Sequence, residues 1–349
     1  MIDRRLMLTG ALASAAEVAA CVPKHKEPLT VVSYGAGTYQ ASHQDAFLKP
    51  FARETGIKTI STTWNAEYAK LRAMVESGKV DWDVVDVTAA ILARGRRDGL
   101  FEKIGALPDA DGFLPGTLDP FGVGNVYWAT VLAYDSRQPN RKPVSWADFF
   151  DTRAFPGPRA LYDDPRANIE FALLASGVPK AEVYPFTPEK LKEAFSRLSA
   201  VRDSVRVWWS DGSQPVQLLL TKQVVMTSAW SGRIFASPQA KAVVDYPWSG
   251  AALELDYWTI PKGSRHARDA AKLIAFASRP DRLAAQANLI GYGPVNTRAL
   301  EQLPGSLLRQ LPTYQQNFEA AFVVNSAQWE RSEDELRSRW LAWKTTGHA

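Results

Sequence analysis

Short apolar runs alternate with segments of helical periodicity along the first hundred residues. Strand-like runs occupy residues 29–34, 57–60 and 80–87. Between them, apolar side chains recur at helical spacing in residues 44–55 and again after Asn65, which we expect to cap the second helix. This alternation predicts a parallel sheet with helices on its faces.

A second α/β unit is expected after an apolar, β-rich run at residues 125–134. Its clearest helix signal is Thr187 followed by Pro188, a good N-cap with proline at the first helical position. The last helix is expected to begin at a capping box that starts with Ser332. We therefore predict an α/β chain of two units.

The N-terminus resembles a bacterial export signal. Arg4 and Arg5 precede an apolar stretch, and Ala19 and Ala20 precede Cys21. We expect residues 1–21 to be a signal or lipoprotein segment, with Cys21 as the acylated residue. The alternative is a buried first helix with a free thiol, which the polar residues 23–28 disfavour.

Length and charge narrow the class of protein. Of the 349 residues, about 329 would remain after removal of a signal, which suits two lobes better than one core. The net charge is +4, and basic residues form only short clusters, so we expect no nucleic-acid partner. No later segment is apolar for long enough to span a membrane, which predicts a soluble mature part, tethered at most by one end.

Residue patterns for catalysis and metal binding are weak. The four histidines are scattered, and one cysteine excludes both a disulfide framework and a cysteine-rich zinc site. The glycine pairs at 35–37 and 122–124 lack the third glycine of a dinucleotide loop, and no Gly-x-Ser-x-Gly elbow occurs. We expect no enzyme, no cofactor and no metal.

Asp256 is the most informative polar residue, because it lies in the apolar run of residues 253–261. An unpaired buried carboxylate is costly, so this side chain needs either a structural arginine or a ligand cation. The run also carries aromatic residues, and Tyr292 follows on a Gly/Pro turn. A cleft for a cationic small molecule would use these residue types.

Several segments together resemble the spermidine/putrescine-type substrate-binding proteins of bacterial ABC importers. They are residues 54–58 (ETGIK), 68–71 (YAKL), 82–85 (WDVV), 163–166 (DDPR), 230–232 (WSG), 260–261 (IP) and 291–292 (GY) with Asn296 downstream. The resemblance implies a type II periplasmic binding protein fold, with two lobes of mixed sheet flanked by helices and a hinge of β crossovers. It implies one lobe of residues 28–132 plus 257–303 and another of residues 133–256 plus 304–349.

The resemblance also implies where a ligand binds. The matching ligand positions are Asp256, Trp230, Tyr292 and Asp164. An ammonium offers three donors to a carboxylate, and its carbon chain lies well against aromatic faces, at about 0.5–2 kcal/mol for each cation–π contact. Each position has a structural alternative: Trp230 could pack the core, Tyr292 could brace a loop and Asp164 could serve a turn.

Tyr34 and Tyr39 flank the first Gly-rich turn and could line the same cleft. The chain departs from the polyamine pattern in that turn, at Ala89 and Ala90, and at Ala167, where a second acid is expected. A long polyamine needs a carboxylate at each end. A shorter amine, or an amino acid whose carboxylate meets Arg206 or Arg233, is therefore a competing ligand.

The resulting functional prediction is an extracytoplasmic, monomeric solute-binding protein. It would capture a putrescine- or spermidine-like amine between its lobes and deliver it to ABC permease subunits in the inner membrane. The alternative ligand is a zwitterionic amino acid such as 4-aminobutyrate. An exported hydrolase using Asp163 and Asp164, or a ligand-gated partner of a membrane receptor, is a less favoured hypothesis. The expected location is the periplasm, where a lipid on Cys21 would anchor the chain.

Overall fold

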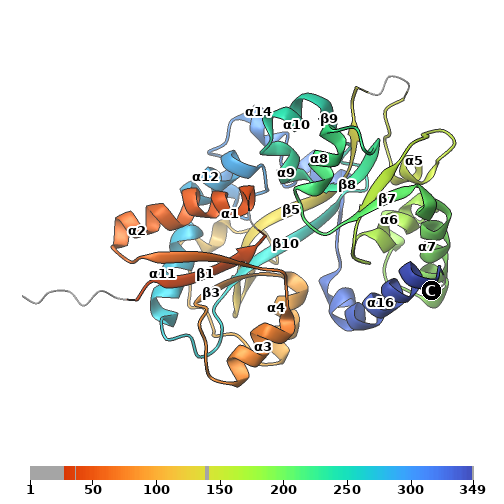
Figure 1. Cartoon of the computed structure of the whole chain (residues 1–349). Coiled ribbons are helices and arrows are strands. Elements are labelled where there is room, and N and C mark those ends of the chain that lie inside the picture. Colours follow the sequence, from red (N-terminus) through yellow and green to blue (C-terminus); the bar gives the residue numbers. More distant parts are fainter. Residues whose placement is uncertain (1–26, 36, 138–140, 348–349) are drawn as a thin grey trace, which may run out of the picture.

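The computed structural model describes residues 27–35, 37–137 and 141–347. Its strands join into one mixed sheet that runs through two halves, and helices cover the sheet in each half (Figure 1). The expected signal segment and Cys21 lie outside the described residues. The chain therefore has the two-lobe α/β architecture that the sequence predicts.

Three parallel strands form the sheet of the first half, with β1 (Leu29–Tyr34) between β2 (Thr59–Trp64) and β3 (Val84–Thr88). The connecting and following helices are α1 (Thr38–His43), a π-helical turn (Gln44–Leu48), α2 (Lys49–Thr55), α3 (Tyr68–Glu76) and α4 (Ala89–Arg97). The predicted parallel β-α-β-α order is confirmed.

Two helix starts in this half differ from the prediction. The first helix begins at Thr38 rather than at residue 44, because Gly37 at φ 88° turns the chain directly from β1 into α1. The residue before α3 is Glu67, not Asn65, because Ala66 at φ 59° interrupts the helical backbone between them. Both differences arise from left-handed backbone positions that apolar periodicity does not reveal.

Two antiparallel strands connect the halves. β10 (Ala252–Thr259) pairs with β3 on one side and with β5 (Gly122–Asp135) on the other, and β5 pairs in turn with β8 (Met226–Trp230). Every residue of β10 is buried. The short strands β4 (Leu118–Asp119), β9 (Val244–Asp245) and β11 (Phe322–Val323) extend these two strands at their edges.

The second half continues the sheet with parallel strands. β8 pairs with β6 (Arg159–Tyr162), and β6 pairs with β7 (Val205–Trp209) at the edge. Its helices are α5 (Trp146–Phe150), α6 (Asn168–Ala175), α7 (Pro188–Val201), α8 (Gln214–Leu220), α9 (Ser231–Phe235), α10 (Pro238–Val243) and the C-terminal α16 (Ser326–Thr346). The Thr187 cap of α7 is confirmed, since its side chain accepts from Lys190 N.

The remaining helices return to the first half or link it to α16. They are α11 (Ala267–Ala277), α12 (Pro280–Ile290), α13 (Thr297–Leu300), α14 (Gly305–Leu308) and α15 (Gln315–Ala320), and short 3-10 turns lie at 110–112, 180–182 and 202–204. The predicted start of the last helix at Ser332 is wrong. α16 begins at Ser326, and Asn325 caps it by accepting from Gln328 N.

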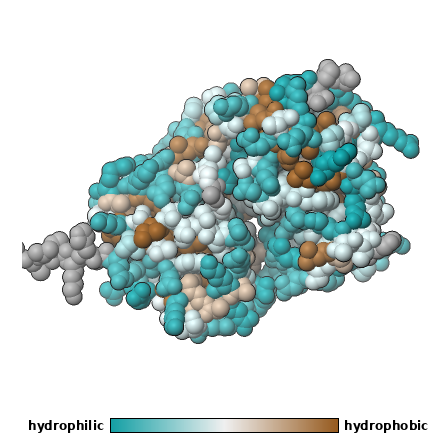
Figure 2. Space-filling model, viewed as in Figure 1, coloured by the Kyte–Doolittle hydropathy of each residue, from teal (hydrophilic) through white to brown (hydrophobic). Residues whose placement is uncertain are grey.

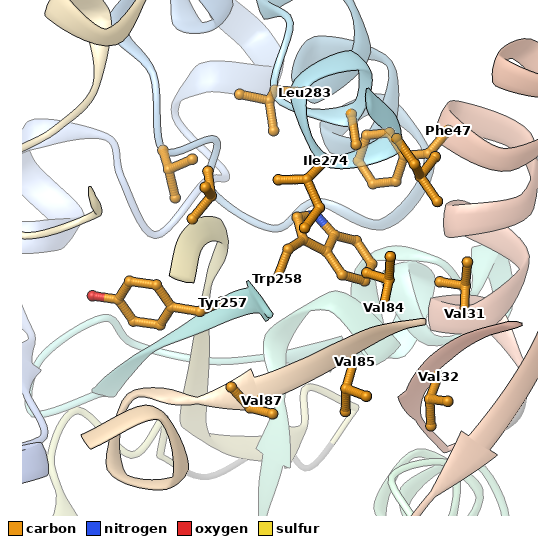
Figure 3. Close-up of a cluster of buried hydrophobic side chains, with 14 of the residues drawn as sticks. Val31, Val32, Phe47, Val84, Val85, Val87, Tyr257, Trp258, Ile274 and Leu283 are labelled. Atoms are coloured by element: carbon orange, nitrogen blue, oxygen red, sulfur yellow. The ribbon is translucent and has the colours of Figure 1, made fainter. Parts of the chain in front are cut away.

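The core of the first half lies on both faces of its sheet (Figure 3). Val31 and Val84 point toward Trp258, and Val32 and Val85 point to the opposite face. Strands covered on both faces are expected to be almost wholly apolar, as β3 is apart from Asp86 and Thr88. These two polar residues therefore require an explanation.

A groove separates the two halves on the surface (Figure 2). The halves contact each other where α4 meets α16, through Arg97 with Glu330 and through Arg94 Nη1, which lies 3.5 Å from Asp334 Oδ1. The expected lobe boundaries fall inside β5 and β10, which belong to both halves. The boundaries at 132 and 256 therefore stay predictions.

Candidate functional site

Two acidic side chains lie on one face of the sheet, on neighbouring strands. Asp256 of β10 pairs with Thr88 of β3, and Asp86 of β3 pairs with Trp258 of β10. Because side chains alternate along a strand, the two acids point to the same face as diagonal neighbours. Asp86 is 0% exposed and Asp256 is 3% exposed.

A β-bulge brings an amide to Asp86. The register between β10 and β5 shifts after Asp256, so that Asn125 is the extra residue of β5. Asn125 Nδ2 donates to Asp86 Oδ1 at 3.3 Å, and Tyr39 Oη donates to Asp86 Oδ2 at 2.7 Å. Both oxygens of Asp86 are therefore satisfied. In contrast, Asp256 Oδ1 has no hydrogen-bond partner among the described residues.

Burial favours the protonated form of both Asp86 and Asp256. It raises the pKa of Asp86 to about 7, although the hydrogen bonds from Tyr39 and Asn125 lower that pKa. Burial also raises the pKa of Asp256 well above its ordinary value, and the charge of Asp86 raises it further. A cation placed beside Asp256 would offset this repulsion and favour the ionised carboxylate.

His43 cannot supply that cation near neutral pH. It is buried beside Asn125, and its Nε2 lies 3.5 Å from Asn125 Nδ2. Burial, together with the charge of Arg233, lowers the pKa of His43 to about 3. The imidazole is therefore neutral near pH 7, and His43 is not a positive partner for Asp86 or Asp256.

Tyrosines from the first half surround the acids. The rings of Tyr39 and Tyr292 meet edge to face at a centroid distance of 5.6 Å. Tyr34 Oη accepts a hydrogen bond from Thr88 N at 2.9 Å, next to Asp256 in the sheet. The three predicted tyrosines, Tyr34, Tyr39 and Tyr292, are therefore brought together with Asp256.

Glycines allow Tyr292 to approach the second half closely. Gly291 ends α12 with φ 65°, which directs the chain into the tyrosine. A Cβ on Gly232 of α9 would lie 2.2 Å from Tyr292 Cε1. Tyr292 therefore contacts the turn that follows Trp230.

Trp230 lies at the end of β8 within a group of aromatic rings. Its ring lies 5.8 Å from that of Trp128, 5.4 Å from that of Trp209 and 5.8 Å from that of Tyr162. Trp128 acts on Asp256 by lowering its pKa, but Trp128 Nε1 has no hydrogen-bond partner among the described residues. The rings offer flat faces beside an incompletely satisfied acid.

Arg233 extends from α9 in the second half to α1 in the first. Its Nη1 donates to Thr38 Oγ1 at 2.9 Å, its Nε has no hydrogen-bond partner in the described part of the chain, and the residue is 9% exposed. Among the described residues no carboxylate forms an ion pair with Arg233. Asp211, whose pKa it helps to lower, is held by hydrogen bonds from Ser213. Among the described residues, the site therefore contains a guanidinium without a carboxylate partner as well as a carboxylate oxygen without a hydrogen-bond partner.

Asp164 has structural partners. Its Oδ2 lies 2.7 Å from Arg337 Nη1 of α16, and its Oδ1 accepts from Arg166 N at 2.9 Å. The neighbouring Asp163 forms an ion pair with Lys344 at 2.6 Å. The structure thus pairs Asp164 with the guanidinium of Arg337 and Asp163, the other acid of the hydrolase hypothesis, with a different cation, Lys344.

The structure does not bring Arg206 close to Asp256, Tyr292 and Arg233. Arg206 is exposed near the start of the edge strand β7, whereas the aromatic Trp209 lies at the other end of that strand. Of the two predicted arginines, Arg233 is the one near Tyr292, whose pKa its charge lowers against the larger effect of burial.

The sequence analysis missed Asp86, Asn125 and Trp128. Asp86 could have been found by the argument applied to Asp256, because it is also an acid within an apolar strand. Asn125 and Trp128 gave no comparable signal, since their roles depend on a bulge and on strand pairing. Within the part of the chain that the structure describes, no group of acids, histidines or cysteines could hold a metal ion. The same part contains no helix long and apolar enough to cross a membrane.

Comparisons with known proteins agree with this architecture. A γ-aminobutyric acid-binding protein of Pseudomonas aeruginosa is 39% identical over 329 residues, 93% of each chain. A spermidine/putrescine-binding periplasmic protein of Escherichia coli is 27% identical over 298 residues, 81% of this chain and 82% of that one. A solved structure of a GABA receptor superposes with a TM-score of 0.84 at 33% identity, covering 93% of this chain and 99% of the other.

Residues 46–317 also match the family described as bacterial extracellular solute-binding proteins. This match covers most of the chain and includes both connecting strands. The relatives are substrate-binding proteins. The chain belongs to the bacterial extracellular solute-binding protein family and is the solute-binding component of an ABC importer.

Proposed function

We propose that this protein binds a small zwitterion, an ω-amino acid such as 4-aminobutyrate, and delivers it to an ABC permease. One observation supports the proposal: Asp256, a buried carboxylate whose Oδ1 has no hydrogen-bond partner among the described residues, and Arg233, a largely buried guanidinium without an acid there, both act on the pKa of Tyr292. The ligand would supply the missing charge to each.

The ammonium end of the ligand would bind at Asp256. Its Oδ1 is free to accept, and Tyr34 and Trp128 lie beside it. A cation there would also offset the repulsion between Asp256 and Asp86. Aromatic faces beside an ammonium contribute about 0.5–2 kcal/mol per contact.

The carboxylate end would bind at Arg233. A guanidinium matches a carboxylate in planar, two-point geometry, and the Nε of Arg233 has no partner among the residues that the structure describes. Because Arg233 of the second half already reaches Thr38 of the first, a carboxylate at this position would join the two halves. Ligand binding would thereby favour their closure.

A polyamine is the second candidate, favoured by the pair of acids Asp86 and Asp256 and by the relative from Escherichia coli. A diamine, however, needs an available acid at its far end. Asp164 is paired with Arg337, and Glu254 with Arg166, so neither is open. The relative from Pseudomonas aeruginosa and the solved GABA receptor also support the amino acid.

Two substitutions test the proposal. Asp256→Asn should weaken 4-aminobutyrate and putrescine alike, since both carry an ammonium. Arg233→Met should weaken only 4-aminobutyrate, by about 2–5 kcal/mol, roughly 30-fold or more. Calorimetric titration of the purified protein measures both effects.

Arg206→Met is the matched control. Arg206 is exposed on β7, so its substitution should change neither the affinity for 4-aminobutyrate nor that for putrescine. An Arg233→Met protein that keeps full affinity for 4-aminobutyrate would contradict the proposed carboxylate site. Loss of putrescine binding in the same variant would contradict the assignment of the ammonium end to Asp256 and of the carboxylate end to Arg233.

The family implies a periplasmic location, and a lipid on Cys21 would anchor the chain to the membrane. Cys21→Ser should release the mature protein from the membrane fraction without changing its affinity. Retention of the variant in that fraction would argue against acylation.

A further inference from the structure

A buried ion-pair network lies next to Asp256 on the same strand. Glu254 precedes Asp256 by two positions on β10, so their side chains share a face. Glu254 Oε2 lies 3.3 Å from Arg166 Nη1, and Arg166 Nη2 lies 3.2 Å from Glu333 Oε2 of α16. The side chains of Arg166 and Glu254 are only 12% and 8% exposed.

The network is held from several directions. The Arg166 guanidinium lies over the ring of Trp329, 5.4 Å from its centroid. Arg337 connects Glu333 to Asp164 at 3.0 and 2.7 Å. Because removal of one partner would leave a buried charge unpaired, these side chains are expected to keep their positions.

A small cavity lies beside this network. A cavity of about 20 Å³ is lined by Arg166, Glu254 and Trp329, and by Ala89 and Ala90 at the start of α4. These alanines follow Thr88, the neighbour of Asp256 in the sheet. A space of this size holds about one water molecule.

We propose that Arg166 and Glu254 are specificity-determining residues that close the site on this side of Asp256 and restrict the ligand to a short carbon chain. The inference rests on the proposed ammonium site at Asp256. A ligand held there can extend toward Arg233, but the Arg166–Glu254 pair blocks extension along β10. The protein should therefore discriminate among amines by length.

Two ligand series test this. One contains ω-amino acids with four, five and six carbons, and the other contains the diamines of the same lengths. Dissociation constants are measured for the unmodified protein, for an opened variant, Arg166→Ala with Glu254→Ala, and for a control, Arg166→Met with Glu254→Gln. The control removes the charges but retains most of the volume.

The unmodified protein should bind the four-carbon member of its preferred series at least tenfold more tightly than the six-carbon member. The opened variant should reduce this ratio at least tenfold, whereas the control should keep it. Equal affinity of the unmodified protein for four and six carbons would overturn the inference, and so would an unchanged ratio in a folded opened variant. If the opened variant does not fold, the length profile of the unmodified protein decides.

Failure of the proposed function gives a different result. Binding of the diamines alone would contradict the zwitterion, while the length ratio in that series would still test Arg166 and Glu254. Binding of neither series would overturn both proposals.

Discussion

Buried charged residues in this chain differ in whether the protein itself satisfies them. Arg159 is fully buried, and its guanidinium donates to the backbone oxygens of Phe149, Asp151, Phe155 and Gly157. Asp256 retains an open oxygen. The contrast separates a charge that the backbone satisfies from one that is incompletely satisfied among the described residues, and the sequence analysis had predicted that Asp256 needs a partner.

Asp86 should make stability depend on pH. The folded protein keeps the proton on Asp86 up to about pH 7, whereas the unfolded chain releases it near pH 4. The protonated Asp86 therefore contributes to folding stability fully at low pH. This contribution is lost as the pH rises from about 4 through 7, at about 1.4 kcal/mol per unit of pKa difference. His43 acts in the opposite direction, since its pKa is lowered, so the two must be separated by substitution.

Asp86→Asn removes this dependence. Urea unfolding of ligand-free protein at pH 5 and pH 8 should show the variant gaining stability relative to the unmodified protein as the pH rises. The control is Asp45→Asn, which changes an exposed acid of an i,i+4 pair. An identical pH dependence in the Asp86→Asn variant and the unmodified protein would contradict the buried-acid assignment.

Arg159 is expected to contribute to stability and not to binding. Arg159→Met would leave buried carbonyl oxygens without donors, at a cost of roughly 3 kcal/mol in the free energy of unfolding. Arg153→Met, an exposed neighbour, should cost less than about 0.5 kcal/mol. Chemical denaturation measures both, and a stable Arg159→Met protein would show that those oxygens find other partners.

At the scale of single elements, periodicity located most helices and strands, but their ends depended on local geometry. Ser332 resembles a capping residue, yet it lies inside α16, where its Oγ donates to Gln328 O. The signal failed because the apolar face of α16 begins earlier, with Trp329, in a stretch rich in polar residues. The true cap, Asn325, follows β11, a strand too short to be recognised by its pattern.

The two candidate caps can be compared directly. Asn325→Ala removes the side chain that accepts from Gln328 N and should cost about 1 kcal/mol of stability. Ser332→Ala changes a mid-helix position and should be neutral within about 0.5 kcal/mol. Both losses of stability are measured by thermal unfolding. A larger loss for Ser332→Ala than for Asn325→Ala would indicate that the helix begins at Ser332.

At the scale of the whole molecule, alternating strands and helices predicted parallel sheets, and the chain length and the family resemblance predicted two lobes. The composition of the site was less predictable. Arg233 and Asp256 meet Tyr292 only through β8 and β10 pairing with β5, which are contacts between residues distant in sequence. Asn125 depends on a register shift that no local pattern encodes.

The central claim is that the site matches one negative and one positive ligand end. The most direct test is to titrate the unmodified protein with 4-aminobutyrate and with putrescine, which share a four-carbon chain and differ at one end. We predict micromolar binding of 4-aminobutyrate, about 8 kcal/mol, and binding of putrescine at least tenfold weaker. Equal or tighter binding of putrescine would contradict the account.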